Sequence, residues 1–152
     1  MLRLVSSVVV LLCLSGCCFQ DPDIIWGDDQ QVIRLTIGEA GVAPSGPRDP
    51  VDVEGLSLSG DLLLVNVSYG GGCAEHDFAL SWDGSFAESN PTQASLVLLH
   101  DAHDDQCRAH VTTTLRFDLT PVKERWREMY RSEHGSTIPH VAGARDIVLY
   151  EF

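Results

Sequence analysis

Hydrophobic and polar residues alternate along several short stretches of this chain, a pattern typical of β-strands that bury one face. The clearest example is residues 108–119, RAHVTTTLRFDL, in which Val111, Leu115 and Phe117 share one side. Residues 61–69, DLLLVNVSY, alternate in the same way. Five further strands are predicted over residues 31–38, 51–60, 78–82, 94–100 and 145–152. The pattern therefore predicts about seven strands.

A change to helical spacing follows the strand at 108–119. Residues 120–135 read TPVKERWREMYRSEHG, and their apolar side chains recur on one helical face: Val122, Trp126, Met129 and Tyr130. Thr120 is the expected N-cap, Pro121 suits the first helical position, and Gly135 suits the C-terminal stop. The strands at 94–100 and 108–119 are expected to form a hairpin through the turn DAHDDQ. The predicted fold is mainly β, an antiparallel β-sandwich or small barrel with one late helix.

The N-terminus has the pattern of a secretory signal. Arg3 precedes an uncharged apolar run from Leu4 to Leu14, which is too short to span a bilayer as a mature helix. The following Leu-Ser-Gly-Cys resembles a bacterial lipobox, which implies cleavage after residue 16 and diacylation of Cys17. The predicted organisation is a lipoprotein signal peptide at 1–16, a tether at 17–30 and a β-rich domain at 31–152. The alternative is ordinary secretion with cleavage nearby.

The charge of the chain limits its partners. The sequence contains 22 acidic residues against 10 lysines and arginines, a net charge of −12. This charge argues against nucleic acid as a partner and favours cationic partners or cations. Two acyl chains on Cys17 would suffice for stable membrane anchoring. The predicted location is the bacterial cell envelope, on the periplasmic side or the outer surface.

Cysteines and histidines gather in two stretches, GGGCAEHDF at 70–78 and HDAHDDQCRAH at 100–110. Outside the cytoplasm, Cys73 and Cys107 are natural disulfide partners. The loop that they would close has about 35 residues, which is worth roughly 3–4 kcal/mol of stability on the loop-entropy model. The preferred interpretation of this region is a disulfide with histidines close by, and it needs no cofactor.

Metal binding is the main alternative for the same residues. Cysteine and histidine together suit zinc or copper, but strand parity puts Cys107 and His110 on opposite faces. A second set, His76 and His100 with Asp101 or Asp105, is compatible with the disulfide. Asp101, Asp104 and Asp105 also form an acidic turn of the kind that coordinates calcium, although without the spacing of an EF-hand. The simplest alternative for the histidines is a hydrogen bond to an aspartate or a carbonyl.

The sequence gives less support for an enzyme than for a binding or metal-binding protein. The sequence contains no G-x-S-x-G, and the glycines at 70–72 are followed by Cys73 without the Lys-Ser/Thr of a phosphate-binding loop. No catalytic residue is therefore assigned. An enzyme of unknown reaction ranks third, after a non-catalytic binding module and an envelope metal-binding protein.

Residues 68–119 also carry a resemblance to a known group. The segments SYGGGCAEHDFALSW, SNPTQASLVLLHDAHDDQC and TTTLRFDLTPVKE resemble uncharacterised bacterial lipoproteins, and in particular the C-terminal part of NigD-like lipoproteins. The matching positions are Cys73, His76, His100, Cys107 and 117–119. The resemblance implies a lipid-anchored β-sandwich and supplies no activity. The expected function is an envelope module that binds an unknown protein or small ligand.

Overall fold

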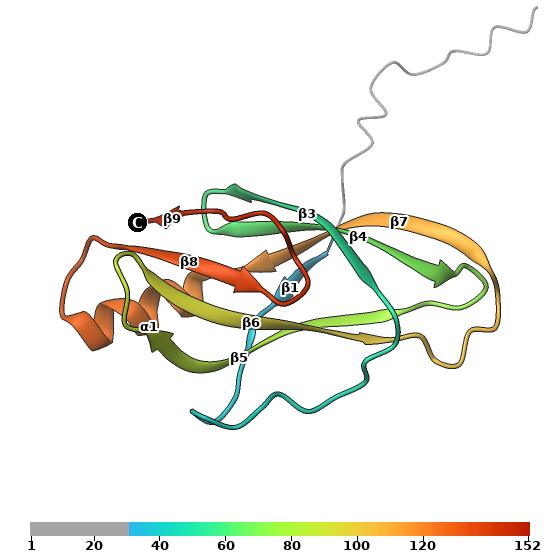
Figure 1. Ribbon diagram of the computed structural model, residues 1–152, viewed down its shortest axis with the longest axis horizontal. Helices are drawn as coiled ribbons and strands as arrows, with labels where there is room; N and C mark the ends of the chain where they lie inside the picture. Colours follow the sequence, from blue (N-terminus) through green and yellow to red (C-terminus); the bar gives the residue numbers. More distant parts are fainter. Residues whose placement is uncertain (1–30) are drawn as a thin grey trace, which may run out of the picture.

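The computed structural model describes residues 31–152. The predicted signal peptide at 1–16, the lipid attachment at Cys17 and the tether at 17–30 lie outside the described residues. Two β-sheets face each other, with one helix at one end (Figure 1). Among the described residues, no helix is long and apolar enough to span a bilayer.

The first sheet, sheet A, has the strand order β1-β7-β4-β3, and the second, sheet B, has the order β2-β5-β6-β8-β9. Their bounds are β1 Val32–Arg34, β2 Thr36–Ile37, β3 Asp52–Ser59, β4 Leu62–Gly71, β5 Asp77–Ala87, β6 Thr92–Asp101, β7 Ala109–Asp118, β8 Ser136–Val141 and β9 Tyr150–Glu151. The helix α1 spans Thr120–Tyr130. The mainly β sandwich with one late helix is thus confirmed, and the sheets do not close into a barrel.

Three details of the predicted sandwich are wrong. There are nine strands among the described residues instead of seven, partly because 31–38 divides between the two sheets at the buried Leu35. The sheets are mixed, since β1–β7, β2–β5 and β6–β8 pair in parallel. The strands expected to form a hairpin, β6 and β7, lie in different sheets, so that the loop between them crosses the sandwich.

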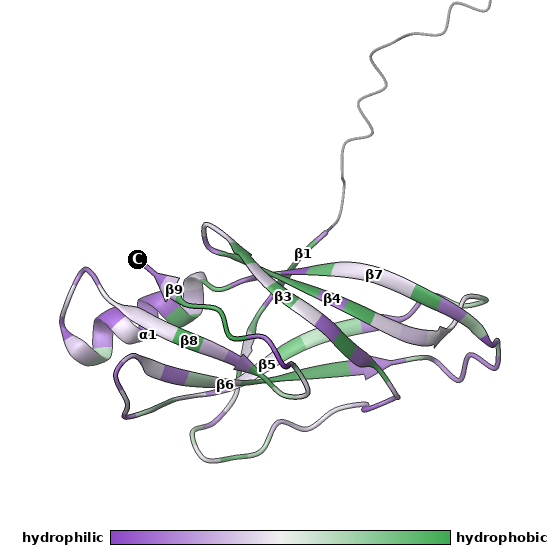
Figure 2. Ribbon diagram, turned by 45° about the horizontal axis from the view of Figure 1, so that its top comes forward, coloured by the Kyte–Doolittle hydropathy of each residue, from purple (hydrophilic) through white to green (hydrophobic). Residues whose placement is uncertain are grey.

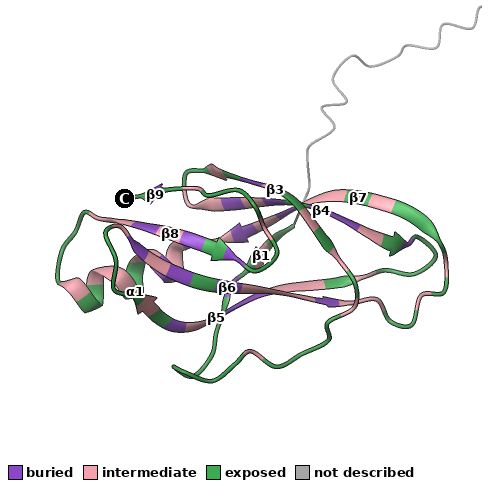
Figure 3. Cartoon of the chain, in the orientation of Figure 1, coloured by how far each residue is buried: buried purple, intermediate pink, exposed green. Residues whose placement is uncertain are grey.

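The core lies between the sheets and follows the alternation of the sequence (Figure 2). Leu63, Val65 and Val67 of β4 face inward from sheet A, and Leu80 and Trp82 of β5 face them from sheet B, all at 1% exposure or less. The buried positions become sparse toward the start of β7, where the strand is half-buried or exposed (Figure 3). The start of β7 therefore contributes less to the core than its end.

The helix caps the other end, although its boundaries differ from those predicted. Leu119 is the N-cap, without a side-chain hydrogen bond, and the helix ends at Arg131, whose φ of 52° is left-handed. Gly135 therefore lies beyond the helix. A Cβ at Gly135 would collide with the Trp126 ring, so glycine is required there for close packing. Trp126 itself donates a hydrogen bond from Nε1 to Thr92 of β6, at 3.1 Å.

Asp61, in the turn between β3 and β4, connects three parts of the fold. Its carboxylate accepts a 2.6 Å hydrogen bond from the Tyr150 hydroxyl and pairs with Lys123 of α1. The hydrogen bonds from Lys123 and then Tyr150 hold the pKa of Asp61 below its usual value, while burial raises the pKa of Tyr150. The carboxylate thus ties β9 and the helix to the β3–β4 turn.

We expect Tyr150→Phe to lower the free energy of unfolding by about 1.5–2 kcal/mol, because it removes a hydrogen bond from a buried hydroxyl to a charged group. The matched control is Tyr130→Phe, whose hydroxyl donates to Glu88 at the surface over 2.8 Å. The control is expected to stay within about 0.5 kcal/mol of wild type in urea unfolding. Equal losses in the two variants would contradict the connecting role of Asp61.

Candidate functional site

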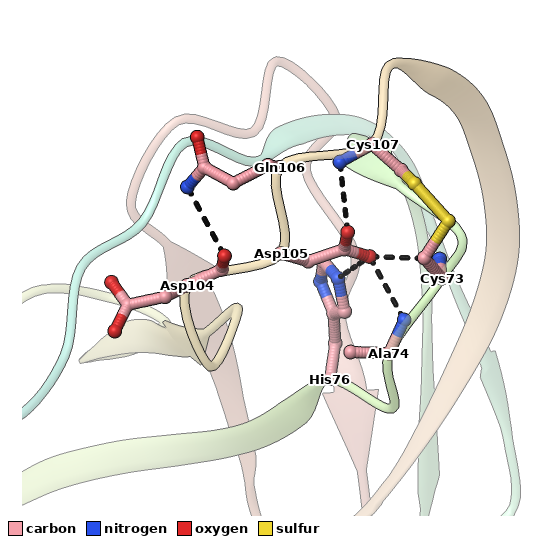
Figure 4. The surroundings of a disulfide bond; sticks show 7 residues. All are labelled: Cys73, Ala74, His76, Asp104, Asp105, Gln106 and Cys107. Atoms are coloured by element: carbon pink, nitrogen blue, oxygen red, sulfur yellow. Dashed lines mark hydrogen bonds and ion pairs between the residues drawn. A yellow bond between two sulfur atoms is a disulfide. The ribbon is translucent and has the colours of Figure 1, made fainter.

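The disulfide joins the end of β4 to the start of β7 (Figure 4). Cys73 follows β4, Cys107 precedes β7, and these two strands are neighbours that pair as far as Gly71 and Ala109. The bond therefore fixes the loop between β6 and β7 against the turn between β4 and β5. Both sequence stretches rich in cysteine and histidine meet at this end of the sandwich.

Asp105 organises the two loops around the disulfide. Its carboxylate accepts backbone hydrogen bonds from Cys107 at 2.9 Å, Cys73 at 2.9 Å and Ala74 at 3.0 Å (Figure 4). These hydrogen bonds, in that order, lower the pKa of Asp105 far below its ordinary value. The side chain is only 2% exposed, so the carboxylate is a buried anion held by backbone N–H groups.

A pair of histidines continues from this carboxylate into the core. His76 Nε2 lies 3.3 Å from Asp105 Oδ2, and His76 Nδ1 lies 2.8 Å from His100 Nε2. His100 Nδ1 lies 3.2 Å from the carbonyl oxygen of Asp49. The Asp105 carboxylate and the Asp49 carbonyl oxygen, at the two ends of this row of contacts, only accept hydrogen bonds. All three contacts are therefore hydrogen bonds only when the two rings together carry three protons on their nitrogens.

Aromatic rings hold the histidines in place. Phe78 and His100 are directly opposite on β5 and β6, and their rings stack at 4.5 Å with an interplanar angle of 2°. The Tyr69 ring lies 4.7 Å from the His76 ring and 5.2 Å from the His100 ring. Cross-strand contacts of this kind stabilise the sheet and fix side-chain rotamers.

The structure brings together only part of the predicted metal-binding set. His76 and His100 are adjacent, but their facing nitrogens contact each other. Asp101 is directed to His103, whose Nδ1 lies 3.7 Å from its carboxylate, and His103 Nε2 contacts Asp77 at 2.8 Å. The Asp77 hydrogen bond raises the pKa of His103.

Cys73, Asp105 and Cys107 are the one trio of histidine, cysteine or carboxylate ligand atoms within 4.8 Å of one another in residues 31–152. In this trio the two sulfurs are bonded to each other, so neither is a thiolate ligand. The carboxylates of the acidic turn also have separate partners. Asp105 accepts the backbone N–H groups of the two cysteines, whereas Asp101 Oδ1 accepts the N–H of His103 at 2.9 Å.

A pocket of about 310 Å³ opens between the two sheets beside the histidines. Its walls come from the start of β1, the start of β5 and the middle of β7: Gln31, Ile33, Glu75, His76, Asp77, Phe78, Thr113, Thr114 and Leu115. The sequence pattern does not reveal this pocket, because the pocket depends on β5 and β7 lying in opposite sheets. The only signal in the sequence was the alternation that directs Leu115 and Phe78 inward.

Three solved structures of proteins from Bacteroides and Parabacteroides are similar to this chain. A NigD-like immunity protein from Bacteroides caccae ATCC 43185 matches with a TM-score of 0.51 and 20% identity, over 80% of this chain and 60% of that one. A candidate lipoprotein from Bacteroides fragilis NCTC 9343 matches at 0.49 and 11%, over 80% and 67%. A candidate toxin-related protein from Parabacteroides distasonis ATCC 8503 matches at 0.46 and 17%, over 80% and 60%.

The likeness to the NigD-like protein concerns the fold, and this chain spans about 60% of the length of that protein. It agrees with the group to which the sequence bore a resemblance, although it does not test the Cys-x-x-His pattern itself. No known family model matches the sequence. No curated protein matches it at a significant level either.

Proposed function

We propose that this chain is a lipid-anchored protein of the bacterial cell envelope whose β-sandwich binds a partner without catalysing a reaction. The observation that carries the proposal is the open side of the sandwich. There, the pocket beside His76 is bordered by β7. Residues 109–115 of β7 pair with β4 on one side, and no strand of residues 31–152 pairs with them on the other, outer side. Such a combination of a free strand edge and a pocket is typical of a recognition surface.

Two further observations support the proposal. The lipobox-like Leu-Ser-Gly-Cys ending at Cys17 supports a lipid anchor, and the fold likeness to a NigD-like immunity protein supports recognition in place of catalysis. The polar groups nearest the pocket, His76, His100 and Asp105, are engaged with one another. They therefore serve the architecture of the site more readily than a reaction.

The anchor is tested by fractionating cells that express the full chain. We expect wild type and Cys18→Ser in the membrane fraction and Cys17→Ser in the soluble fraction. The binding surface is tested in the same cells with a photo-crosslinking amino acid at Thr113, which lines the pocket, and at Glu133, which is exposed near the helix. A discrete adduct is expected at Thr113 and none at Glu133.

Two results would overturn the proposal. Retention of Cys17→Ser on the membrane would remove the lipid anchor, and absence of any adduct at Thr113 would remove the binding surface. Zinc or copper bound stoichiometrically by the purified protein, and lost in His76→Ala, would favour the metal-binding alternative instead.

A further inference from the structure

Within residues 31–152, the backbone groups of β7 that no other strand takes up can be identified from its pairing with β4. Leu119 N donates to Asp61 O at 2.9 Å, so this pair is a hydrogen-bonded pair of the antiparallel ladder. The register continues without a shift to Gly71↔Ala109. Because hydrogen-bonded and non-hydrogen-bonded pairs alternate, the odd-numbered residues of β7 bond to β4. His110, Thr112 and Thr114 therefore direct their N–H and C=O groups away from β4.

β1 takes up this outward side only at the far end of β7, from Val32↔Arg116 to Arg34↔Asp118. In Figure 1, the remaining part of β7 runs along the upper right rim of the molecule. An unpaired edge of this kind is a template for another extended segment.

Two other stretches of sheet edge among the described residues are partly covered. The outward N–H of Leu56 on β3 donates to the Asp146 carboxylate at 3.0 Å. β6 extends beyond its partner β8, and there His100 exchanges backbone hydrogen bonds with Pro47 and Asp49, at 3.2 and 3.0 Å. The stretch 109–115 of β7 thus differs from these two places, where a side chain or a loop takes up outward backbone groups.

The charges beside this edge indicate what kind of segment it fits. The pocket adjoins the open stretch at Thr113–Leu115, with apolar walls from Ile33, Phe78 and Leu115 and acidic groups from Glu75 and Asp77. Glu75 and Asp77 are exposed, and the whole chain carries a net charge of −12. An added strand directs every second side chain into the pocket. Apolar and cationic side chains would be complementary to it.

From this geometry, and resting on the proposed function, we infer that the outer edge of β7 receives an extended basic segment of a partner protein as an added strand. Its backbone bonds to His110, Thr112 and Thr114, and its lysine or arginine side chains meet Glu75 and Asp77. Main-chain pairing then provides affinity, and the pocket provides selectivity.

Charge distinguishes a basic partner segment from two other possible occupants of this edge. The segment of the same chain that precedes β1 contains Asp28 and Asp29, which are acidic like the pocket wall. A second copy of the chain would bring its own Glu75 and Asp77 to the same edge. Like charges disfavour both arrangements, whereas a basic partner is attracted.

The test uses the full chain in detergent micelles and a fluorescent nine-residue peptide of alternating lysine and valine. Binding is followed by fluorescence anisotropy. Thr112→Pro removes one outward N–H and leaves the β4 ladder intact, as proline is tolerated at a free edge. We expect it to weaken binding roughly tenfold or more, whereas Thr112→Val should change affinity less than about twofold. A peptide N-methylated on alternate amides should also bind roughly tenfold more weakly.

Several outcomes would overturn the inference. Equal binding of the N-methylated peptide would mean that charge alone attracts it. Protection of the His110, Thr112 and Thr114 amides from hydrogen exchange in the free protein would mean that the chain or a second copy already occupies the edge. Failure of the lysine–valine peptide to bind, together with an in-cell adduct at Thr113, would exclude strand addition and leave the proposed function standing.

Discussion

Removal of the Cys73–Cys107 disulfide is expected to lower the free energy of unfolding by about 3–4 kcal/mol, because the bond closes a loop over a sequence separation of 34 residues. For a domain of this size the loss corresponds to a fall in Tm of roughly 10–20 °C. The loop contains the residues of β5 and β6, which form a large part of sheet B in the folded state. The crosslink therefore restricts the conformations of these residues in the unfolded chain. The measurement is thermal unfolding of Cys73→Ser/Cys107→Ser beside wild type.

Reductant supplies the control. Dithiothreitol should shift wild type to the Tm of the double variant and leave the double variant unchanged, because the remaining cysteines precede residue 31. A similar shift in both proteins would assign the effect to another thiol. An unchanged Tm in the double variant would mean that Asp105 and the β4–β7 ladder hold this end of the sandwich without the crosslink.

The strands that alternation predicted best are those with one face in the core. Leu115 and Phe117 of β7 are buried as expected, and so are Val65 and Val67 of β4. The pattern could not say which sheet each strand joins, because alternation reports only an inward face. As a result β6 and β7 were expected to be neighbours, and the crossing between the sheets was missed.

β8, Ser136–Val141, was not predicted at all, for a physical reason. It contains Pro139, which cannot donate to a ladder and so argues against a strand. In the structure Pro139 lies on the part of β8 that β9 does not reach, because β9 pairs only with Ser136 and Thr137. Its missing N–H therefore leaves that pairing intact.

The candidate site, like the fold, could be predicted only in part. The clustering of Cys73, His76, His100 and Cys107 in two short stretches indicated that the stretches meet, and in the structure they do. The role of Asp105 was not visible, since it is one of several aspartates in an acidic loop. Only the backbone geometry distinguishes a carboxylate that accepts three N–H groups from one that is solvated.

Asp105→Asn is therefore expected to lower Tm at pH 7 by roughly 10 °C, because a neutral amide replaces an anion held by three backbone N–H groups and His76. The matched control is Asp104→Asn, which makes the same charge change in the same loop at an exposed position. Asp104 has a left-handed φ of 57°, which asparagine adopts readily. The control should shift Tm by less than about 2 °C.

The pH dependence of stability separates the role of the Asp105 charge from that of its shape. The pKa of Asp105 is lowered in the folded state from an ordinary value of 3.8, so its stabilisation is complete above that value and is lost as pH falls below it. Unfolding measured between pH 3 and 7 should show a steeper acid loss in wild type and Asp104→Asn than in Asp105→Asn. Identical acid profiles for all three proteins would contradict a structural role for the Asp105 anion. A shallower profile in Asp105→Asn, with the disulfide still formed, would show that this buried carboxylate anchors the two loops beside the disulfide.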